Sequence, residues 1–325
     1  MQRGRSGVGV GALGVALLAA TMLSACGSGG GGQLAEQGDA SSSTAPPSTV
    51  RPTVTTDRTT PATIVPRTEP TKAAASAAVP VARLSSPVTA RATARELAEV
   101  EVALRADDRD PAHLDALGRR QQLAYRALAS HPDWVASVLD RVPAEIRGVV
   151  QANVDAGALL ADLTQGGPAV TTLPDWKVLT PLAPSTLRAA YDEAEAATGI
   201  PWAYLAAVHL VETRMGRIHG NSSAGAQGPM QFIPTTWAEY GTGDITSDHD
   251  AIQAAARLLA ARGGPDDMDR ALLGYNNDKR YVSAVEAYAQ VMLSDPRAYD
   301  GYHAWRVFFA TDTGAFLLPE GFGTS

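Results

Sequence analysis

The sequence predicts a mainly α-helical protein with a small β-hairpin near its C-terminus. From Thr89 onward, apolar residues recur at helical spacing, as Leu97, Val100 and Leu104 do. These periodic stretches are bounded by Ser, Asp, Pro and Gly, the residue types with which helices begin and end. Near the C-terminus the pattern changes, because two short apolar runs flank the polar residues 311–314, which is typical of a hairpin.

A first helical segment is expected over residues 88–168. Asp110 followed by Pro111 is an N-cap with proline at the first helical position. Further prolines separate two more helices, and a Gly-Gly-Pro run ends the segment. Asp107 and Asp108 precede the cap, and we interpret these aspartates as helix-boundary residues rather than as a metal-binding loop. No pattern in this segment indicates catalysis.

A second segment, residues 173–325, is expected to contain the remaining helices and the hairpin. Ser185 is placed to cap a helix that Gly199 ends. Pro201 begins the next helix, which runs to Glu212. Further helices are expected over residues 235–240, from a cap at Asp248 or Asp250 to 262, over 270–273 and over 279–293.

The N-terminus has the features of a bacterial export signal over residues 1–26. Arg3 and Arg5 precede an apolar stretch rich in Gly and Ala, which is short for a membrane span. It ends in Leu23-Ser-Ala-Cys26, which resembles a lipobox, whose cysteine receives a diacylglycerol. We therefore expect membrane attachment through a lipid on Cys26, at the outer face of the cell membrane or in the cell wall. An uncleaved membrane helix with an incidental cysteine is the alternative.

Residues 27–87 predict a disordered linker, because they carry too little apolar surface to offset the entropy of ordering. Cys26 is the only cysteine among 325 residues, so no internal disulfide is possible. The net charge of −7 speaks against nucleic acid as a partner. Cell-wall material and small molecules remain as possible ligands.

Glu212 is the first candidate for catalysis. It ends an apolar helix, and removal from water among valine and leucine side chains would raise its pKa. A carboxyl that stays protonated can donate a proton to a leaving-group oxygen, as glycosidic cleavage requires. The alternative is an ordinary glutamate on the solvent side of the helix that pairs with Arg214 or Arg217.

A glycine-rich loop, residues 216–232, follows the helix. Its glycines permit tight turns and a close approach of backbone to a ligand. Gln231 carries an amide that can donate to, and accept from, a sugar hydroxyl or N-acetyl group. Met230, Phe232 and Trp237 offer apolar contact, although core packing is the commoner role of such aromatic residues.

Three motifs in this order resemble lytic murein transglycosylases. They are Glu212-Thr-Arg-Met-Gly216, the run SSAGAQGPMQFIPTTW over 222–237, and Leu273-Gly-Tyr-Asn-Asn277. The family pattern is Glu-Ser-x-x-Gly, then Gly-Ala-x-Gly-x-x-Gln-Phe-x-Pro-Ser-x-Trp, then Tyr-Asn, and the middle motif is long and specific. The resemblance covers about residues 173–293 and points to the membrane-bound lipoprotein type B group, in an actinobacterial-type lipoprotein. Departures from the pattern are Thr213 for serine, Met215 for an aromatic residue and Gln227 for an apolar one.

The resemblance implies a lysozyme-like helical catalytic domain that cleaves peptidoglycan glycan strands without a cofactor. Glu212 matches the single catalytic acid/base, which would break the β-1,4 bond between MurNAc and GlcNAc and leave 1,6-anhydro-MurNAc ends. Ser222 and Gln231 match positions that contact the substrate. Tyr275 and Asn276 match the pair that lines the cleft, with Tyr275 as the expected partner of the Glu212 carboxyl. A monomer is expected.

Two other functions stay open. A lysozyme-type muramidase, which hydrolyses the same bond, would use a second carboxylate such as Glu239 or Asp244 to position a water molecule. A lipoprotein that only binds peptidoglycan is the non-enzymatic alternative, although the intact Glu212, Gln231 and Tyr275 argue against it.

Two metal-site interpretations are weak. His209 and Glu212 lie three residues apart on one helix, but no His-Glu-x-x-His motif is present. Asp244, Asp248 and Asp250 are too closely spaced for a twelve-residue calcium loop, so helix capping is preferred. We therefore expect no metal.

Overall fold

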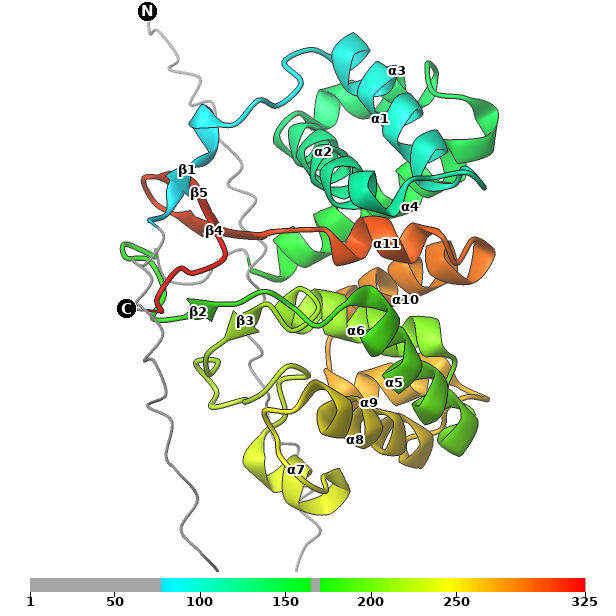
Figure 1. Cartoon of the computed structure of the whole chain (residues 1–325), viewed down its shortest axis with the longest axis vertical. Coiled ribbons are helices and arrows are strands. Elements are labelled where there is room, and N and C mark those ends of the chain that lie inside the picture. Colours follow the sequence, from blue (N-terminus) through cyan, green and yellow to red (C-terminus); the bar gives the residue numbers. More distant parts are fainter. Residues whose placement is uncertain (1–76, 165–169, 325) are drawn as a thin grey trace, which may run out of the picture. The chain divides into compact units, whose positions relative to one another are not determined.

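The computed structural model describes residues 77–164 and 170–324 (Figure 1). All of them belong to one compact unit. The predicted signal peptide, the lipidation site Cys26 and most of the predicted linker lie outside the described residues. The predicted mainly α class is confirmed, because the described residues are largely helical and their strands are short and include a C-terminal hairpin.

The N-terminal segment is a group of packed helices whose starts follow the sequence. The Thr89 hydroxyl accepts from the Ala92 amide at the first helix, and the Asp110 carboxylate accepts from the Ala112 amide at the second. Such caps satisfy amides that have no partner inside a helix. The helices are α1 (Ala90–Leu104), α2 (Pro111–Ser130), α3 (Val135–Leu139) and α4 (Ala144–Leu163).

The second segment contains the helices α5 to α11. Gly199 ends α5 in a left-handed conformation, with φ of 77°, which glycine adopts without strain. Ser247 caps α8 in place of either predicted residue, Asp248 or Asp250, and its hydroxyl accepts from the Asp250 amide. The helices are α5 (Pro184–Thr198), α6 (Trp202–Thr213), α7 (Pro234–Tyr240), α8 (Asp248–Ala261), α9 (Met268–Tyr275), α10 (Lys279–Ser294) and α11 (Ala298–His303).

The two helical segments share one hydrophobic core. Helix α4 packs along α10, and α2 packs against α11, so buried residues of both segments belong to a single cluster. The Tyr302 hydroxyl of α11 donates to Asn153 Oδ1 of α4 at 3.0 Å inside this cluster. In Figure 1, α11 and β4 run between helices α1–α3 and helices α5–α9. The boundary expected at residues 168–173 therefore does not separate two cores.

A three-stranded antiparallel sheet has the order β1 (Val79–Pro80), β5 (Gly314–Leu318) and β4 (Val307–Thr311). Strand β1 pairs with β5 through Val79 and Leu317. The predicted linker is therefore too long at its C-terminal end, because residues 79–80 cover the free edge of the hairpin. A second pair joins β2 (Lys177–Val178) to β3 (Ile218–His219), just after the α6 helix.

Candidate active site

Helix α6 is buried along its whole length. Every residue from Trp202 to Thr213 is buried, because α5, α8, α10 and α11 all pack against this helix. An all-round covering explains why α6 is apolar on every side. Glu212 is its one acidic residue, and only 4% of Glu212 is exposed.

Burial controls the protonation of Glu212. Loss of water around the carboxyl raises its pKa to about 8, and a hydrogen bond from Tyr281 acts in the opposite direction. The Tyr281 hydroxyl donates to Glu212 Oε1 at 2.7 Å. At neutral pH the carboxyl is therefore mostly protonated, which is the state that a general acid needs.

Tyr281, and not Tyr275 as predicted, is the hydrogen-bond partner of Glu212. The Tyr275 hydroxyl instead donates to the carbonyl oxygen of Met230 at 2.5 Å. Tyr275 nevertheless lies in the electrostatic field of the acid, because burial and then the charge of Glu212 raise the pKa of its hydroxyl. Phe232 packs edge-on against Tyr275, with ring centroids 6.0 Å apart.

Sequence reasoning missed Tyr281 because its pattern is that of a packing residue. It lies on the buried face of α10 with Val285 and Tyr288, at four- and seven-residue spacing. Nothing in that periodicity distinguishes a tyrosine that binds a carboxyl from one that fills the core. The nearby Tyr-Asn motif drew attention to Tyr275 instead.

The chain leaves α6 through a left-handed turn. Arg214, Met215 and Gly216 have φ values of 57°, 59° and 79°, a conformation that costs non-glycine residues roughly 1–2 kcal/mol each. The Arg214 amide donates to the Leu210 carbonyl and the Met215 amide to the His209 carbonyl. These bonds satisfy the last carbonyls of the helix, as helix C-caps do.

The interpretation of Glu212 as a solvent-facing residue paired with an arginine is wrong. The carboxyl of Glu212 is buried and accepts a hydrogen bond from Tyr281, so it does not face solvent. Arg217 pairs with Glu320 at 2.9 Å and donates to the Trp305 carbonyl at 2.9 Å. Arg214 is itself buried, and its guanidinium donates to the carbonyl one turn earlier in α6.

Thr213 joins the acid-bearing helix to the glycine-rich loop. Its hydroxyl donates to the Pro229 carbonyl at 2.6 Å and accepts from the Gly216 amide at 3.1 Å. Threonine in place of serine therefore keeps the hydroxyl that makes this link. Since the next carbonyl of the loop, that of Met230, accepts from Tyr275, the loop is fixed against both α6 and α9.

The glycine-rich loop folds back on itself. The Ser222 hydroxyl oxygen accepts from the amide four residues ahead at 2.9 Å, and Gln227 pairs with Phe232 in an isolated β-bridge. Gly228 has a φ of 73°, and a Cβ there would lie 1.9 Å from the Ile245 carbonyl oxygen. Only glycine fits at this contact. Ser222 is buried in the loop and holds its shape.

Gln231 is held in a left-handed backbone conformation in the glycine-rich loop. Its φ is 50°, and its side-chain amide nitrogen donates to the carbonyls of Gly228 at 2.8 Å and Gly220 at 3.4 Å. Its Oε1 atom is buried and has no hydrogen-bond partner among the described residues. The nitrogen thus serves the loop, and the oxygen is left as an acceptor.

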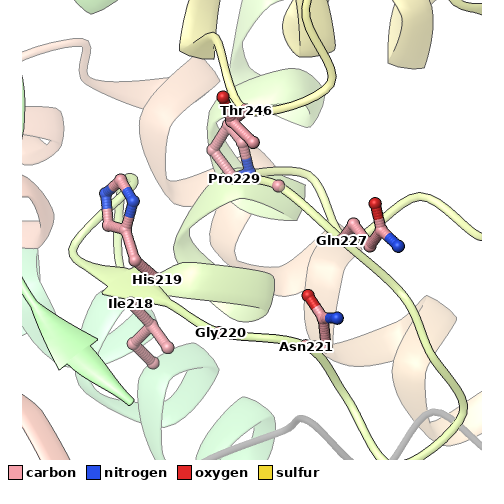
Figure 2. A pocket seen from close by; sticks show the side chains of 8 residues that line it. Ile218, His219, Gly220, Asn221, Gln227, Pro229 and Thr246 are labelled. Atoms are coloured by element: carbon pink, nitrogen blue, oxygen red, sulfur yellow. The ribbon is translucent and has the colours of Figure 1, made fainter.

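A small hollow of about 130 Å³ opens on the same loop (Figure 2). This volume is below the range of about 300–1,000 Å³ typical of pockets for whole small molecules, so the hollow suits one ring or substituent of a larger ligand. Figure 2 shows the amides of Asn221 and Gln227 on one side and the ring of His219 on the other. The lining residues are Ile218, His219, Gly220, Asn221, Gln227, Gly228, Pro229 and Thr246.

The structure brings most of the predicted site residues together. The Thr213 hydroxyl contacts the Pro229 carbonyl, and the Tyr275 hydroxyl contacts the Met230 carbonyl. These two contacts bring together the segments that carry Glu212, Gln231 and Tyr275. Ser222 lies at the start of the same loop. Asn276 is half-buried at the end of α9, where its amide donates to the carbonyl of Leu272.

The other carboxylates considered for catalysis are engaged elsewhere or exposed. Asp244 is exposed, and its carboxylate accepts from both the amide and the hydroxyl of Thr246 at 2.8 Å, which lowers its pKa. Glu239 lies on the exposed side of α7. In the part of the chain that the structure describes, no group of three or more His, Cys, Asp or Glu residues is arranged to hold a metal ion.

Comparison with known proteins gives one partial similarity. No protein-family model and no solved structure matches the chain. A curated protein, membrane-bound lytic murein transglycosylase F of Thiobacillus denitrificans, is 30% identical over 121 residues, which cover 35% of this chain and 26% of the relative. The chain thus spans about a quarter of that relative's length. The relative is named transglycosylase F, so the assignment to the type B group stays a prediction. Over about a third of its length, the chain is similar to a lytic murein transglycosylase.

Proposed function

We propose that the protein is a peptidoglycan lytic transglycosylase with Glu212 as its only acid/base group. One observation carries this proposal: a buried carboxyl with a pKa of about 8 ends a helix beside a glycine-rich loop. The similarity to a curated lytic murein transglycosylase supports the same class of reaction. The substrate is the β-1,4 bond between MurNAc and GlcNAc in a glycan strand.

In the first step Glu212 donates its proton to the glycosidic oxygen. The bond from that oxygen to C1 of MurNAc breaks, and positive charge develops at C1. The raised pKa keeps the proton available at neutral pH, because burial disfavours the carboxylate. General acid catalysis of this kind contributes about 10²–10⁴-fold to a rate.

In the second step the resulting carboxylate acts as the base. The C6 hydroxyl of the same MurNAc attacks C1, its proton returns to Glu212, and a 1,6-anhydro ring closes. Tyr281 donates to Glu212 Oε1, and this bond stabilises the carboxylate during the interval between the steps. No water is consumed, so one carboxyl suffices.

The neighbouring polar groups are suited to hold the sugar. The side-chain amide of Gln231 lies in the glycine-rich loop, and we assign it the predicted contact with the sugar. The hollow beside the loop has the size of a substituent site, with amide groups of Asn221 and Gln227 at its edge. Ser222 and Asn276 keep their predicted substrate-contacting roles as part of this proposal.

Transglycosylation is preferred to hydrolysis because neither candidate for a second carboxylate is placed to help. Asp244 holds Thr246, and Glu239 faces solvent. A hydrolase with two carboxylates needs the second one across the scissile bond, to activate a water molecule or to act as a nucleophile. With Glu212 as the one carboxyl proposed for the chemistry, attack by the substrate's own hydroxyl is favoured.

We further propose that the enzyme acts at the outer face of the cell membrane, tethered by a lipid on Cys26. The name of the curated relative includes the term membrane-bound, and the lipobox-like sequence supports attachment by lipid. Within residues 77–164 and 170–324, no helix is long and apolar enough to cross a membrane. Two acyl chains hold a protein at a membrane where one does not.

The test is digestion of purified peptidoglycan by the wild type and by Glu212→Gln, followed by mass spectrometry. We expect wild-type products with anhydro ends, which are one water lighter than reducing ends, and a variant slower by about 10²–10⁴-fold. Products that carry mainly reducing ends would establish the muramidase alternative. A fully active Gln variant would exclude Glu212 as the acid.

A further inference from the structure

Three polar side chains from three helices meet beside the last turn of α6. His209 of α6 is fully buried, and its Nδ1 lies 2.7 Å from the Tyr191 hydroxyl of α5. Its Nε2 lies 3.2 Å from Asp248 Oδ1 of α8. This second contact has the distance of an ion pair but not the alignment of a hydrogen bond, so Asp248 acts on the ring by charge and contact. We call these three residues the α6 clamp.

The α6 clamp also touches the left-handed turn that follows the acid. The Tyr191 hydroxyl lies 3.5 Å from the sulfur of Met215. A Cβ on Gly216 would lie 2.3 Å from Asp248 Oδ1 and 3.3 Å from His209 Nε2. Residue 216 must therefore be glycine both for its φ and for the space that Asp248 occupies.

We propose that Tyr191, His209 and Asp248 are positioning residues that set the orientation of Glu212. The role rests on the proposed function, since it assigns to the clamp the placement of that acid. His209 precedes Glu212 by three residues, about one helical turn, and its carbonyl accepts from the Met215 amide. The clamp therefore holds α6 through the side chain of His209 and the turn through its backbone.

A buried hydrogen bond fixes the rotation of α6 about its axis more sharply than apolar contacts do, because it requires a particular distance and angle. The remaining side chains of α6 are mostly apolar, and apolar contacts have no donor–acceptor geometry of this kind. The buried imidazole of His209 is hydrogen-bonded to Tyr191 at Nδ1 and in contact with Asp248 at Nε2, so a movement of the ring would break the buried hydrogen bond and separate the ring from the carboxyl. Tyr191 of α5 and Asp248 of α8 contact His209 on one side of α6. On the side of α10, Tyr281 donates a hydrogen bond to Glu212.

A catalytic group must be placed accurately, because a displacement of about 1 Å can lower the rate by about 10²-fold. The clamp also gives a role to two groups that had suggested metal sites. His209 had suggested zinc and Asp248 calcium, and in the structure each is the other's partner. The three residues need not touch the substrate to control the reaction.

The experiment compares Asp248→Ala, the milder Asp248→Asn and Tyr191→Phe with a matched control, His249→Ala. His249 lies in the same first turn of α8 and also contacts α5, through Glu193 at 3.1 Å, but at the exposed surface. Two quantities are measured on the full chain: kcat and KM for peptidoglycan, and hydrogen exchange of the backbone amides of residues 215 and 216.

We expect Asp248→Ala to lower kcat by about 10²-fold with KM little changed, and to speed exchange at residues 215 and 216 by tenfold or more. Asp248→Asn and Tyr191→Phe should give smaller changes in the same direction, and His249→Ala should give none. If the clamp variants leave kcat and exchange at wild-type values, the proposal is overturned. A wild type without activity on peptidoglycan would count against the proposed function, whereas the exchange data alone decide whether the clamp holds the turn.

Discussion

Replacement of Glu212 by glutamine should stabilise the folded protein at neutral pH while it removes activity. The pKa of Glu212 is raised from 4.5 to about 8 by burial. This difference of about 3.5 units corresponds to roughly 5 kcal/mol against the ionised form in the folded state. Glutamine has nearly the same shape, can accept the bond from Tyr281, and does not ionise.

The sign follows from proton binding. Between pH 4.5 and about 8 the folded protein keeps a proton on Glu212 that the unfolded chain releases. The stability that this group contributes is therefore fully present below about pH 4.5 and is lost as the pH rises through about 8. At pH 7 the wild type has lost about 3 kcal/mol relative to low pH, from about 2.5 units at about 1.36 kcal/mol each.

The assay is urea unfolding of wild type and Glu212→Gln at a series of pH values, with the exposed Glu145→Gln as the control. The advantage of the Glu212 variant should grow by about 1.4 kcal/mol per pH unit and level off near roughly 5 kcal/mol above pH 8. At pH 7 the advantage of about 3 kcal/mol corresponds to about 6–12 °C in Tm for a domain of this size. Stability curves that stay parallel from pH 4 to 9 would refute the burial argument, whether or not the protein is an enzyme.

Three further predictions concern the same site. The rate of glycan cleavage should fall as the pH rises through about 8, because Glu212 loses the proton that it donates. Tyr281→Phe removes the hydrogen bond that favours the Glu212 carboxylate. The fall in rate should therefore move to higher pH by about 1–2 units. An unchanged pH–rate profile would mean that this hydrogen bond has no effect on the pKa of Glu212. Thr213→Val should destabilise the protein by about 1–3 kcal/mol, because it leaves the buried Pro229 carbonyl unpaired, whereas Thr213→Ser should be close to wild type in urea unfolding. A loss of stability in Thr213→Ser but not in Thr213→Val would show that the methyl group matters and the hydroxyl does not.

The sequence predicted those parts of the molecule that local patterns describe. Apolar periodicity predicted the helices, and the Asp110 cap and the Gly199 stop were both correct. The predicted Ser185 cap was wrong, because α5 already begins at Pro184 and has no side-chain cap. At α8 the prediction missed by one residue, because Ser247 stands next to Asp248 and both can cap a helix. Glu212 attracted attention because a lone carboxyl interrupts an otherwise apolar helix, and the structure confirms its burial.

The parts that escaped prediction depend on contacts between distant segments. Val79 pairs with Leu317 at the opposite end of the chain, and nothing in a Pro- and Ala-rich stretch marks it as an edge strand. Tyr281 was hidden among core residues with the same spacing. His209 suggested a metal because its true neighbours, Tyr191 and Asp248, come from helices before and after it.

The packing of α4 on α10 has a consequence for the modularity of this protein. Tyr281 and the residues that cover α4 belong to the same helix, so one face of α10 supports the acid and another adjoins the N-terminal segment. A fragment that began at Leu173 would leave this second face bare and would free the helix that carries the tyrosine. Residues 173–325 therefore do not form a unit that can be cut out or transplanted alone, because residues 90–163 stabilise the packing of α10.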